Sequence, residues 1–146
     1  MSPQGSRHAA RLAELDRCLG DAYRAIAHVR AQLPLDARPY SLPEPDLAVV
    51  RGGARDYRDR HPTGGDTLLA IEIASTSQAI DRKKASLYGS AGVPVYWLVD
   101  IANRRLEVFS DASPDSGFRR HEVLEPGAEV PLPSLDVRWS VSELVD

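Results

Sequence analysis

The sequence lacks the chemical features that stabilise disulfide-rich or membrane-spanning proteins. Cys18 is the only cysteine among 146 residues, which excludes an internal disulfide framework and a zinc site made of several cysteines. No apolar run approaches the roughly 20 residues that a membrane-spanning helix needs, and the N-terminus has no signal-peptide apolar region. The expected compartment is therefore the cytoplasm, with no membrane partner.

An excess of positive charge is also missing. The 18 Lys and Arg residues and 21 Asp and Glu residues give a net charge of −3, which argues against a protein that coats nucleic acid through bulk charge. It does not exclude an enzyme acting on nucleic acid, because metal-binding carboxylates lower the net charge. The length suits one domain, residues 1–146, with its own core.

The spacing of apolar residues predicts three helical segments. Residues three and four positions apart predict a helix over 6–19, ended by Gly20. A second helix is expected over 78–91, with its N-cap within Ser75–Ser77 and Gly92 as its stop. A last helical turn is expected near 142–145.

Alternating or continuous apolar runs predict the strands. The expected strands are within 23–35 and at 46–50, 68–74, 95–99, 105–109, 119–124 and 137–139. Polar loops are expected at 52–65 and 110–117, and the proline-rich segment 41–45 should be an extended connector. The pattern is that of an α+β fold, a mixed sheet with a helix crossing over between the strands 68–74 and 95–99.

Glu72 is the most informative single residue. It interrupts an otherwise aliphatic run, Leu68 to Ala74, where an unpaired carboxylate would cost several kcal/mol. Ala70 and Ala74 share its face of the strand and leave room around it. The plainer interpretation is a carboxylate on the solvent face of a half-exposed strand.

Asp46 and Lys84 would join Glu72 if the sheet forms as expected. Asp46 opens a strand directly after a proline, and Lys84 lies on the helix that follows the Glu72 strand, one turn before Tyr88. Carboxylate oxygens completed by water and phosphate suit Mg²⁺, and a nearby lysine can orient or deprotonate the attacking water. Taken alone, Asp46 could equally be a turn residue, and Lys84 an exposed helix lysine.

Four segments together resemble a known family. They are Pro43-Glu44-Pro45-Asp46-Leu47-Ala48-Val49-Val50, Leu69-Ala70-Ile71-Glu72-Ile73-Ala74-Ser75, Asp81-Arg82 with Lys84 and Tyr88, and Ala91-Gly92-Val93-Pro94-Val95-Tyr96-Trp97-Leu98-Val99-Asp100. In this order they are similar to the Uma-type family of predicted endonucleases, in the PD-(D/E)xK restriction-endonuclease-like superfamily. The resemblance covers nearly the whole chain.

The resemblance implies a function and a set of site residues. It implies a Mg²⁺- or Mn²⁺-dependent endonuclease acting on DNA, with a restriction-endonuclease-like mixed sheet flanked by helices and a homodimeric assembly. Asp46 and Glu72 would bind the metal, and Lys84 would complete the catalytic set. His8 and Tyr88 are further candidates for lining the site, and Lys83 is a substitute for Lys84.

The sequence departs from the family pattern at several points. The superfamily lysine normally lies two residues after the glutamate, where this chain has Ala74. Relatives usually begin with a strand pair carrying a glutamate, ahead of a segment resembling residues 1–8, so the N-terminal hairpin is expected to be absent, unless the start codon has been chosen too late. The spacing from Asp81 to Lys84 is one residue shorter, which would rotate Asp81 by roughly 100° around a helix. Val95 stands where relatives often carry a glutamate.

Two other functions stay open. The first, which the departures favour, is a catalytically inactive relative that acts as a binding or dimerisation module. The second is a nuclease that acts on RNA, or a toxin-like one. Tyr88, Tyr96 and Trp97 could stack on bases, but we expect these aromatic residues in the core or at an interface.

Overall fold

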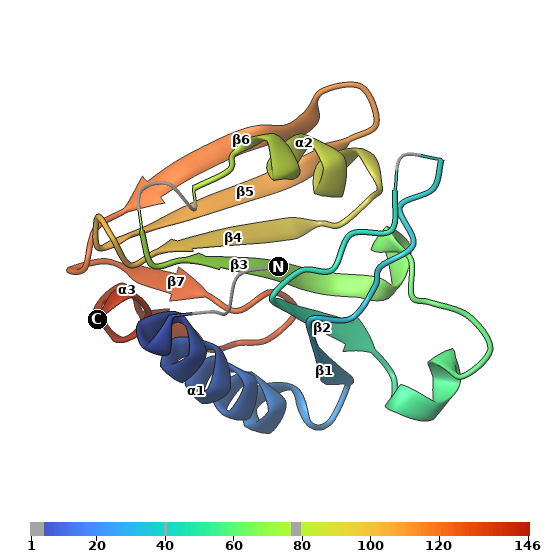
Figure 1. Ribbon diagram of the computed structural model, residues 1–146, viewed down its shortest axis with the longest axis horizontal. Helices are drawn as coiled ribbons and strands as arrows, with labels where there is room; N and C mark the ends of the chain where they lie inside the picture. The colour runs from blue at the N-terminus through green and yellow to red at the C-terminus, as the bar shows by residue number, and fades with distance from the viewer. Residues whose placement is uncertain (1–4, 40, 77–79) are drawn as a thin grey trace.

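The computed structural model describes residues 5–39, 41–76 and 80–146, which form a six-stranded mixed sheet with flanking helices (Figure 1). The strands lie side by side in chain order: β1 (Ala27–Ala31), β2 (Leu47–Arg51), β3 (Thr67–Ala74), β4 (Val95–Asp100), β5 (Arg105–Ser113) and β6 (Gly117–Leu124). Only β3 and β4 are parallel among these neighbours. A parallel pair needs a crossover connection, and it carries α2 (Lys83–Ser90).

The two faces of the sheet are covered by different elements. On the α1 face, α1 (Ser6–Tyr23), α3 (Val141–Val145) and the ribbon of β7 (Glu129–Pro131) and β8 (Arg138–Ser140) pack around one apolar cluster. On the α2 face, α2 packs over a second cluster. From Leu69 onwards, the apolar residues of β3 and β4 alternate between the clusters, as the period of two in a strand requires. This confirms the expected α+β architecture.

β3 is buried along its whole length, from Thr67 to Ala74. A strand covered on both faces reads as a continuous hydrophobic run rather than an alternating one, which explains the aliphatic sequence around Glu72. Ala70 and Ala74 belong to the cluster on the α2 face. Glu72 therefore points to the α2 face, between two small neighbours, as expected.

α1 is one turn longer than its sequence pattern predicts. Gly20 does not end the helix, which continues to Tyr23. Leu19 and Tyr23, four residues apart, are both fully buried, and the Tyr23 hydroxyl donates a hydrogen bond of 2.7 Å to the Pro133 carbonyl. Packing of that last turn outweighs the low helix propensity of glycine. No helix in the described ranges is long and apolar enough to cross a membrane.

α2 begins later than predicted. Ser77 and residues 78–79 lie outside the described residues, but residues 80–82 are not helical and Arg82 is the N-cap. The Asp81 carboxylate accepts a hydrogen bond of 3.0 Å from the Lys83 backbone N–H, an interaction that competes with helix formation. Asp81 therefore precedes the helix. The prediction that Asp81 and Lys84 lie on one helix, with Asp81 rotated by roughly 100° around its axis, is wrong. Gly92, with φ of 93°, follows the end of α2 as predicted.

The C-terminal half differs from the expectation in two places. The predicted polar loop over 110–117 is wrong in extent, because β5 continues to Ser113 and pairs with Gly117 at the start of β6. β7 has no counterpart in the prediction, since its three residues, Glu129–Pro131, are too few to show a period. The expected strand near 137–139 is β8, and the terminal helical turn is α3.

Gly89 marks a close contact between α2 and β6. A Cβ atom at this position would collide with the backbone carbonyl of Gly117, whereas a Cβ at Gly20 in α1 would meet no atom within 4 Å. Backbone atoms cannot move aside as a flexible side chain can. The position of α2 over the sheet therefore depends on the absence of a side chain at Gly89.

We expect Gly89→Ala to lower the free energy of unfolding by about 1–3 kcal/mol, because α2 must move off the sheet. Gly20→Ala is the matched control and should raise stability by about 0.5–1 kcal/mol through helix propensity. Thermal unfolding followed by circular dichroism measures both. A Gly89→Ala variant as stable as the unmodified chain would contradict this packing.

Candidate functional site

Asp46, directly before β2, lies opposite Glu72 in the antiparallel neighbour β3. Leu47 of β2 pairs with Ile71 of β3, so the residue before Leu47 meets the residue after Ile71. The Asp46 backbone N–H donates a hydrogen bond of 2.8 Å to Glu72 Oε1, and the Ile73 N–H donates one of 2.8 Å to Asp46 Oδ2. Each carboxylate is held by the backbone of the other strand. Both are therefore fixed relative to the sheet.

Two further side chains reach this carboxylate pair from the helices. Lys84 Nζ of α2 lies 2.5 Å from Glu72 Oε2. His8 Nε2, from the first turn of α1, lies 3.2 Å from Asp46 Oδ2. The fold thus brings together four polar side chains that are far apart in the sequence.

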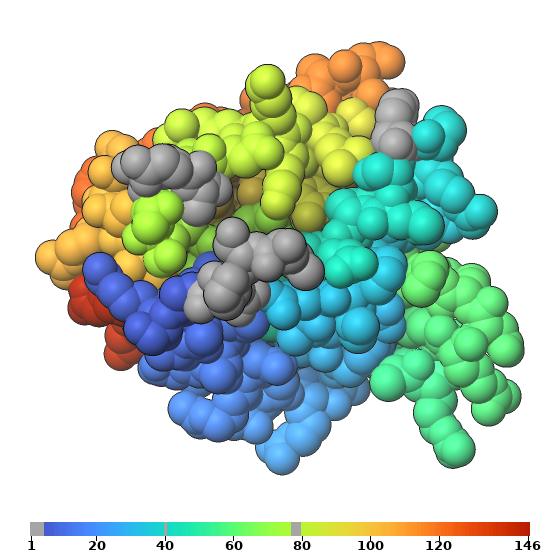
Figure 2. Space-filling view, in the orientation of Figure 1, coloured from blue at the N-terminus to red at the C-terminus, as the bar shows by residue number. Residues whose placement is uncertain are grey.

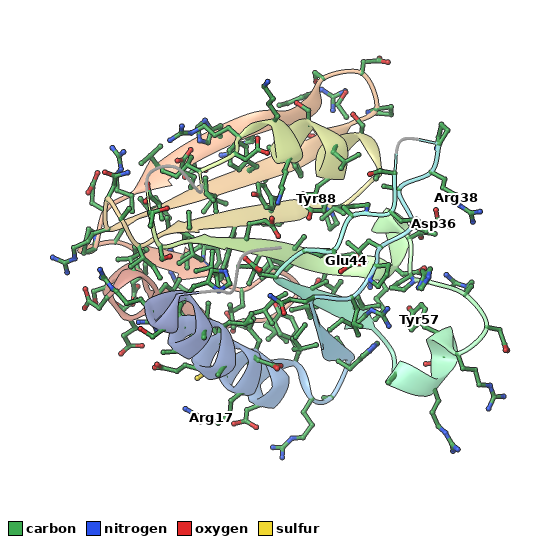
Figure 3. The ribbon with its side chains drawn as sticks, in the orientation of Figure 1. Arg17, Asp36, Arg38, Glu44, Tyr57 and Tyr88 are labelled. Carbon is green, nitrogen blue, oxygen red and sulfur yellow. The ribbon has the colours of Figure 1, made fainter. Side chains whose placement is uncertain are left out.

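A small cavity of about 170 Å³ opens beside the pair. Its lining comprises Glu44, Asp46, Glu72, Ile73, Asp81, Lys84, Tyr96 and Leu98. Figure 3 labels Glu44, on the segment before β2, and Tyr88, on α2, near this region. A larger cavity of about 450 Å³ lies between α1 and C-terminal residues. Another cavity, of about 560 Å³, is lined by Asp36, Arg38, Pro39, Thr63 and Ala91. Volume therefore does not identify the site, and the buried carboxylate and its lysine line the small cavity.

Burial dominates the electrostatics of Glu72, which is only 9% exposed. Desolvation raises the pKa of its carboxyl, the charge of Asp46 acts in the same direction, and the hydrogen bond from Lys84 opposes both. For Lys84, burial alone would lower the pKa, but the hydrogen bond and charge of Glu72 outweigh it and raise the pKa. The raised pKa of Lys84 favours its ammonium form, while ionisation of the buried Glu72 carboxyl costs folding free energy.

The lining of the cavity fits a divalent cation through the chemistry of its donors. Carboxylate oxygens are what Mg²⁺ and Mn²⁺ prefer, and Mg²⁺ commonly takes one or two carboxylates with water and phosphate in the other positions. Within residues 5–39, 41–76 and 80–146, no group of three or more His, Cys, Asp or Glu side chains is arranged to hold a metal ion. Asp46 and Glu72 would therefore supply two ligands rather than a complete cage.

The remaining predicted site residues occupy different environments. Lys83 is exposed, and its side chain forms no ion pair with the described residues, so α2 directs Lys84 to the carboxylates rather than Lys83. Tyr88 is 1% exposed and packs against Tyr96, with 5.1 Å between ring centroids. Tyr88 is a core residue on the buried face of α2.

The sequence interpretation missed three residues that line the cavity, Glu44, Asp81 and Tyr96. Tyr96 was expected in the core or at an interface, and its ring is indeed fully buried. It pairs with Ala70, two residues from Glu72 on the same face of the sheet. The register between β3 and β4 would have revealed this, but the register of a parallel pair cannot be read from the residues alone.

A second buried glutamate lies on the same face, two strands away. Glu72 is opposite Leu98, and Leu98 is opposite Glu107. The Arg82 guanidinium donates two hydrogen bonds to Glu107, of 3.0 and 2.7 Å, and His121 Nε2 lies 2.8 Å from it. Burial would raise the pKa of Glu107, but these partners outweigh it and lower the pKa. Glu107 is a satisfied structural charge, in contrast to Glu72.

The sequence and the fold both have known relatives. A family model named Uma2 and described as "Putative restriction endonuclease" matches residues 1–142. No curated protein matches the chain.

Two solved structures share the fold. A putative nuclease belonging to DUF820 from Anabaena variabilis ATCC 29413 is 21% identical, with a TM-score of 0.77 over 99% of this chain and 83% of that one. The type IIG restriction endonuclease BpuSI is 14% identical, with a TM-score of 0.50 over 95% of this chain but only 15% of its own. At these identities the likeness is one of fold, and it confirms the restriction-endonuclease-like architecture.

We expect Glu72→Gln to be as stable as the unmodified chain or more stable, because the amide removes a buried charge while the half-exposed Lys84 stays solvated. Glu107→Gln should instead lower the free energy of unfolding by about 1–2 kcal/mol, since it weakens the bonds to Arg82 and His121. Chemical unfolding of the two variants measures the contrast. Greater destabilisation by Glu72→Gln than by Glu107→Gln would contradict this electrostatic description.

The effect of Glu107→Gln should also depend on pH. Because the pKa of Glu107 is lowered in the fold from its ordinary value of 4.5, the carboxylate contributes stability above that pH and loses it as pH falls through the lowered pKa. The unfolding curves of the two chains should therefore converge in acid. A difference that stays constant from neutral pH into acid would show that Glu107 acts through its shape alone.

Proposed function

The chain belongs to the Uma2 family of putative restriction endonucleases, and from this premise we propose that it hydrolyses phosphodiester bonds of DNA with the help of Mg²⁺ or Mn²⁺. One observation carries the proposal. Two carboxylates, Asp46 and Glu72, are fixed to each other across β2 and β3, beside a lysine and a cavity. A structural role alone would be served better by an apolar side chain at Glu72, because the buried charge is costly.

Asp46 and Glu72 would hold the cation through their carboxylate oxygens. When bound, such an ion lowers the pKa of a coordinated water and offsets negative charge on the phosphate. Asp46 already accepts a hydrogen bond from the Ile73 N–H, which fixes its plane. His8, 3.2 Å from the same oxygen, would act as a positioning residue for Asp46.

Lys84 would bind the phosphate as a cation. Its raised pKa favours the ammonium form, which supports charge stabilisation rather than removal of a proton from water. The Lys84 side chain is 47% exposed, whereas that of Glu72 is only 11% exposed. The ammonium can therefore turn towards an incoming phosphate while the carboxylate stays in place.

The loop between β2 and β3 supports a nucleic-acid substrate despite the net negative charge. Arg55 and Arg58 on its short helix (Ala54–Tyr57 and the residue after it) are exposed, and Arg58 makes only a weak contact of 3.9 Å with Asp59. Figure 2 shows the loop, in green, projecting from the right-hand side of the molecule. These cations are available to phosphates.

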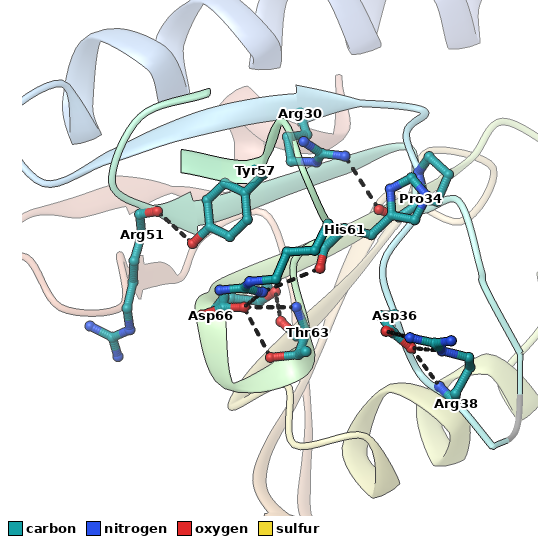
Figure 4. A network of polar contacts seen from close by, with 11 residues as sticks. Arg30, Pro34, Asp36, Arg38, Arg51, Tyr57, His61, Thr63 and Asp66 are labelled. Atoms are coloured by element: carbon teal, nitrogen blue, oxygen red, sulfur yellow. Dashed lines mark hydrogen bonds and ion pairs between the residues drawn. The ribbon is translucent and has the colours of Figure 1, made fainter. Parts of the chain in front are cut away.

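Hydrogen bonds tie the same loop to the end of β2 and also join residues within it, as Figure 4 shows. The Tyr57 hydroxyl donates a hydrogen bond of 2.9 Å to the Arg51 carbonyl, and Arg60 donates one of 2.7 Å to Asp66. β2 separates the loop from Asp46 by five residues, about 17 Å at 3.3 Å per residue. That distance corresponds to about five nucleotides along one DNA strand. The loop would therefore contact the backbone away from the cleaved bond.

A binding or dimerisation module without catalysis is the second candidate. It is favoured because no group of three or more His, Cys, Asp or Glu side chains is arranged to hold a metal ion in the described part of the chain. A homodimer, which could address both DNA strands, is compatible with either function and is tested by sedimentation. The parallel incubation with RNA described below distinguishes an RNA substrate from a DNA substrate.

Incubation with supercoiled plasmid tests the leading proposal. We expect cleavage with Mg²⁺ or Mn²⁺, none with chelator, loss of detectable cleavage in Glu72→Gln, and a fall of about 100-fold in Lys84→Ala. Lys83→Ala is the matched control and should cleave normally. Cleavage that persists in Glu72→Gln would overturn the assignment, and its absence from the unmodified chain would favour the binding module. A parallel incubation with RNA shows which nucleic acid is the substrate.

The loop arginines generate a separate prediction. The double substitution Arg55→Ala and Arg58→Ala should weaken DNA binding and reduce the slope of log affinity against log salt by about 2, because two phosphate contacts are lost. Arg17→Ala with Arg138→Ala removes the same charge from the α1 side and should leave the slope unchanged. Fluorescence anisotropy over a salt series measures both. Equal slopes for the two double variants would exclude the loop from the DNA interface.

A further inference from the structure

The Tyr96 hydroxyl is buried beside the candidate site without a partner. Tyr96 is fully buried, lines the same cavity as Asp46 and Glu72, and its Oη has no hydrogen bond within the part of the chain that the structure describes. A hydroxyl withdrawn from water without a partner destabilises a fold. The structure of the protein alone does not explain its presence.

Packing of the ring does not require the hydroxyl. The Tyr96 ring lies between Tyr88 and Phe109, with centroid distances of 5.1 and 5.4 Å. A phenylalanine would keep both aromatic contacts and remove the unpaired polar atom. The hydroxyl is therefore best explained by a ligand that supplies an acceptor.

The chemistry of the cavity identifies the class of that ligand. Its charged side chains are four carboxylates, Glu44, Asp46, Glu72 and Asp81, and one cation, Lys84, whose ammonium already lies on Glu72. Tyr96 adds a donor without adding charge. Burial also raises the pKa of Tyr96, so the hydroxyl keeps its proton to donate. Carboxylates that bind a metal ion need no hydrogen bond from Tyr96. A phosphate oxygen, in contrast, is an acceptor that such a neutral donor would stabilise.

We propose that Tyr96 Oη donates a hydrogen bond to a non-bridging oxygen of the phosphodiester that is cleaved. The inference deepens the proposed nuclease function and rests on it. Tyr96 and Lys84 would then hold the phosphate from two directions, one as a neutral donor and the other as a cation. The β3–β4 register places Tyr96 opposite Ala70, two residues before Glu72 on the same face, and Tyr96 lines the cavity with Glu72 and Lys84.

Tyr96→Phe tests the proposal, with Tyr23→Phe as the matched control. Tyr23 is a buried tyrosine on the α1 face whose hydroxyl bonds to Pro133. We expect Tyr96→Phe to lower kcat/KM for plasmid cleavage by about 10- to 100-fold. Its melting temperature should be unchanged or higher, and its Mn²⁺ affinity unchanged. Tyr23→Phe should show the reverse, with a lower melting temperature and normal cleavage.

A binding measurement separates this proposal from the nuclease function itself. With Ca²⁺, and with the oligonucleotide checked to remain intact, Tyr96→Phe should bind DNA about 10-fold more weakly than the unmodified chain. If the unmodified chain binds DNA more tightly than Tyr96→Phe in Ca²⁺ but does not cleave DNA in Mg²⁺ or Mn²⁺, the nuclease proposal fails and the phosphate contact stands. Equal binding and equal cleavage would overturn the role of Tyr96. So would a loss of cleavage accompanied by a lower melting temperature or lower Mn²⁺ affinity.

Discussion

The burial of the Glu72 carboxylate is the constraint on which the rest of the site depends. β3 is covered on both faces and paired on both edges, so a charge in its middle can be compensated only by groups that the fold brings to it. The Asp46 backbone N–H and the Lys84 ammonium are those groups. Each comes from an element whose position is fixed by other contacts, the start of β2 and the first turn of α2. The desolvation of Glu72 is only partly offset.

The two buried glutamates of the α2 face show two different ways of accommodating charge. Glu107 receives two hydrogen bonds from one guanidinium and a third contact from His121, which lower its pKa. Glu72 has a half-exposed lysine, and its pKa is raised. The first arrangement is complete within the protein. The second leaves a carboxylate that a cation would stabilise further, which is what a metal ligand requires.

Much of this arrangement could be predicted from the residues. The aliphatic run around Glu72 indicates a buried strand, and the two alanines on its face follow from the period of two. The order of segments in the chain also placed Asp46 and Lys84 near Glu72. These predictions depend on local patterns, which the sequence carries directly.

The rest depends on contacts between segments distant in the sequence. The local pattern predicts an end of α1 at Gly20, but the burial of Tyr23 extends the helix. The start of α2 depends on a hydrogen bond that the Lys83 backbone N–H donates to the Asp81 carboxylate, and this start decides that Lys84 rather than Lys83 meets Glu72. The residues alone predict the core or an interface for Tyr96, because its place opposite Ala70, on the face that carries Glu72, depends on the β3–β4 register.

Direct titration with Mn²⁺ tests the central claim, that Asp46 and Glu72 form a metal site. Calorimetry or electron paramagnetic resonance of the purified chain should show one Mn²⁺ site per molecule. Asp46→Asn should lose it while keeping the fold, and Asp36→Asn, whose carboxylate pairs with Arg38 away from the cavity, should keep it. Equal Mn²⁺ binding by the unmodified chain and Asp46→Asn would contradict the account.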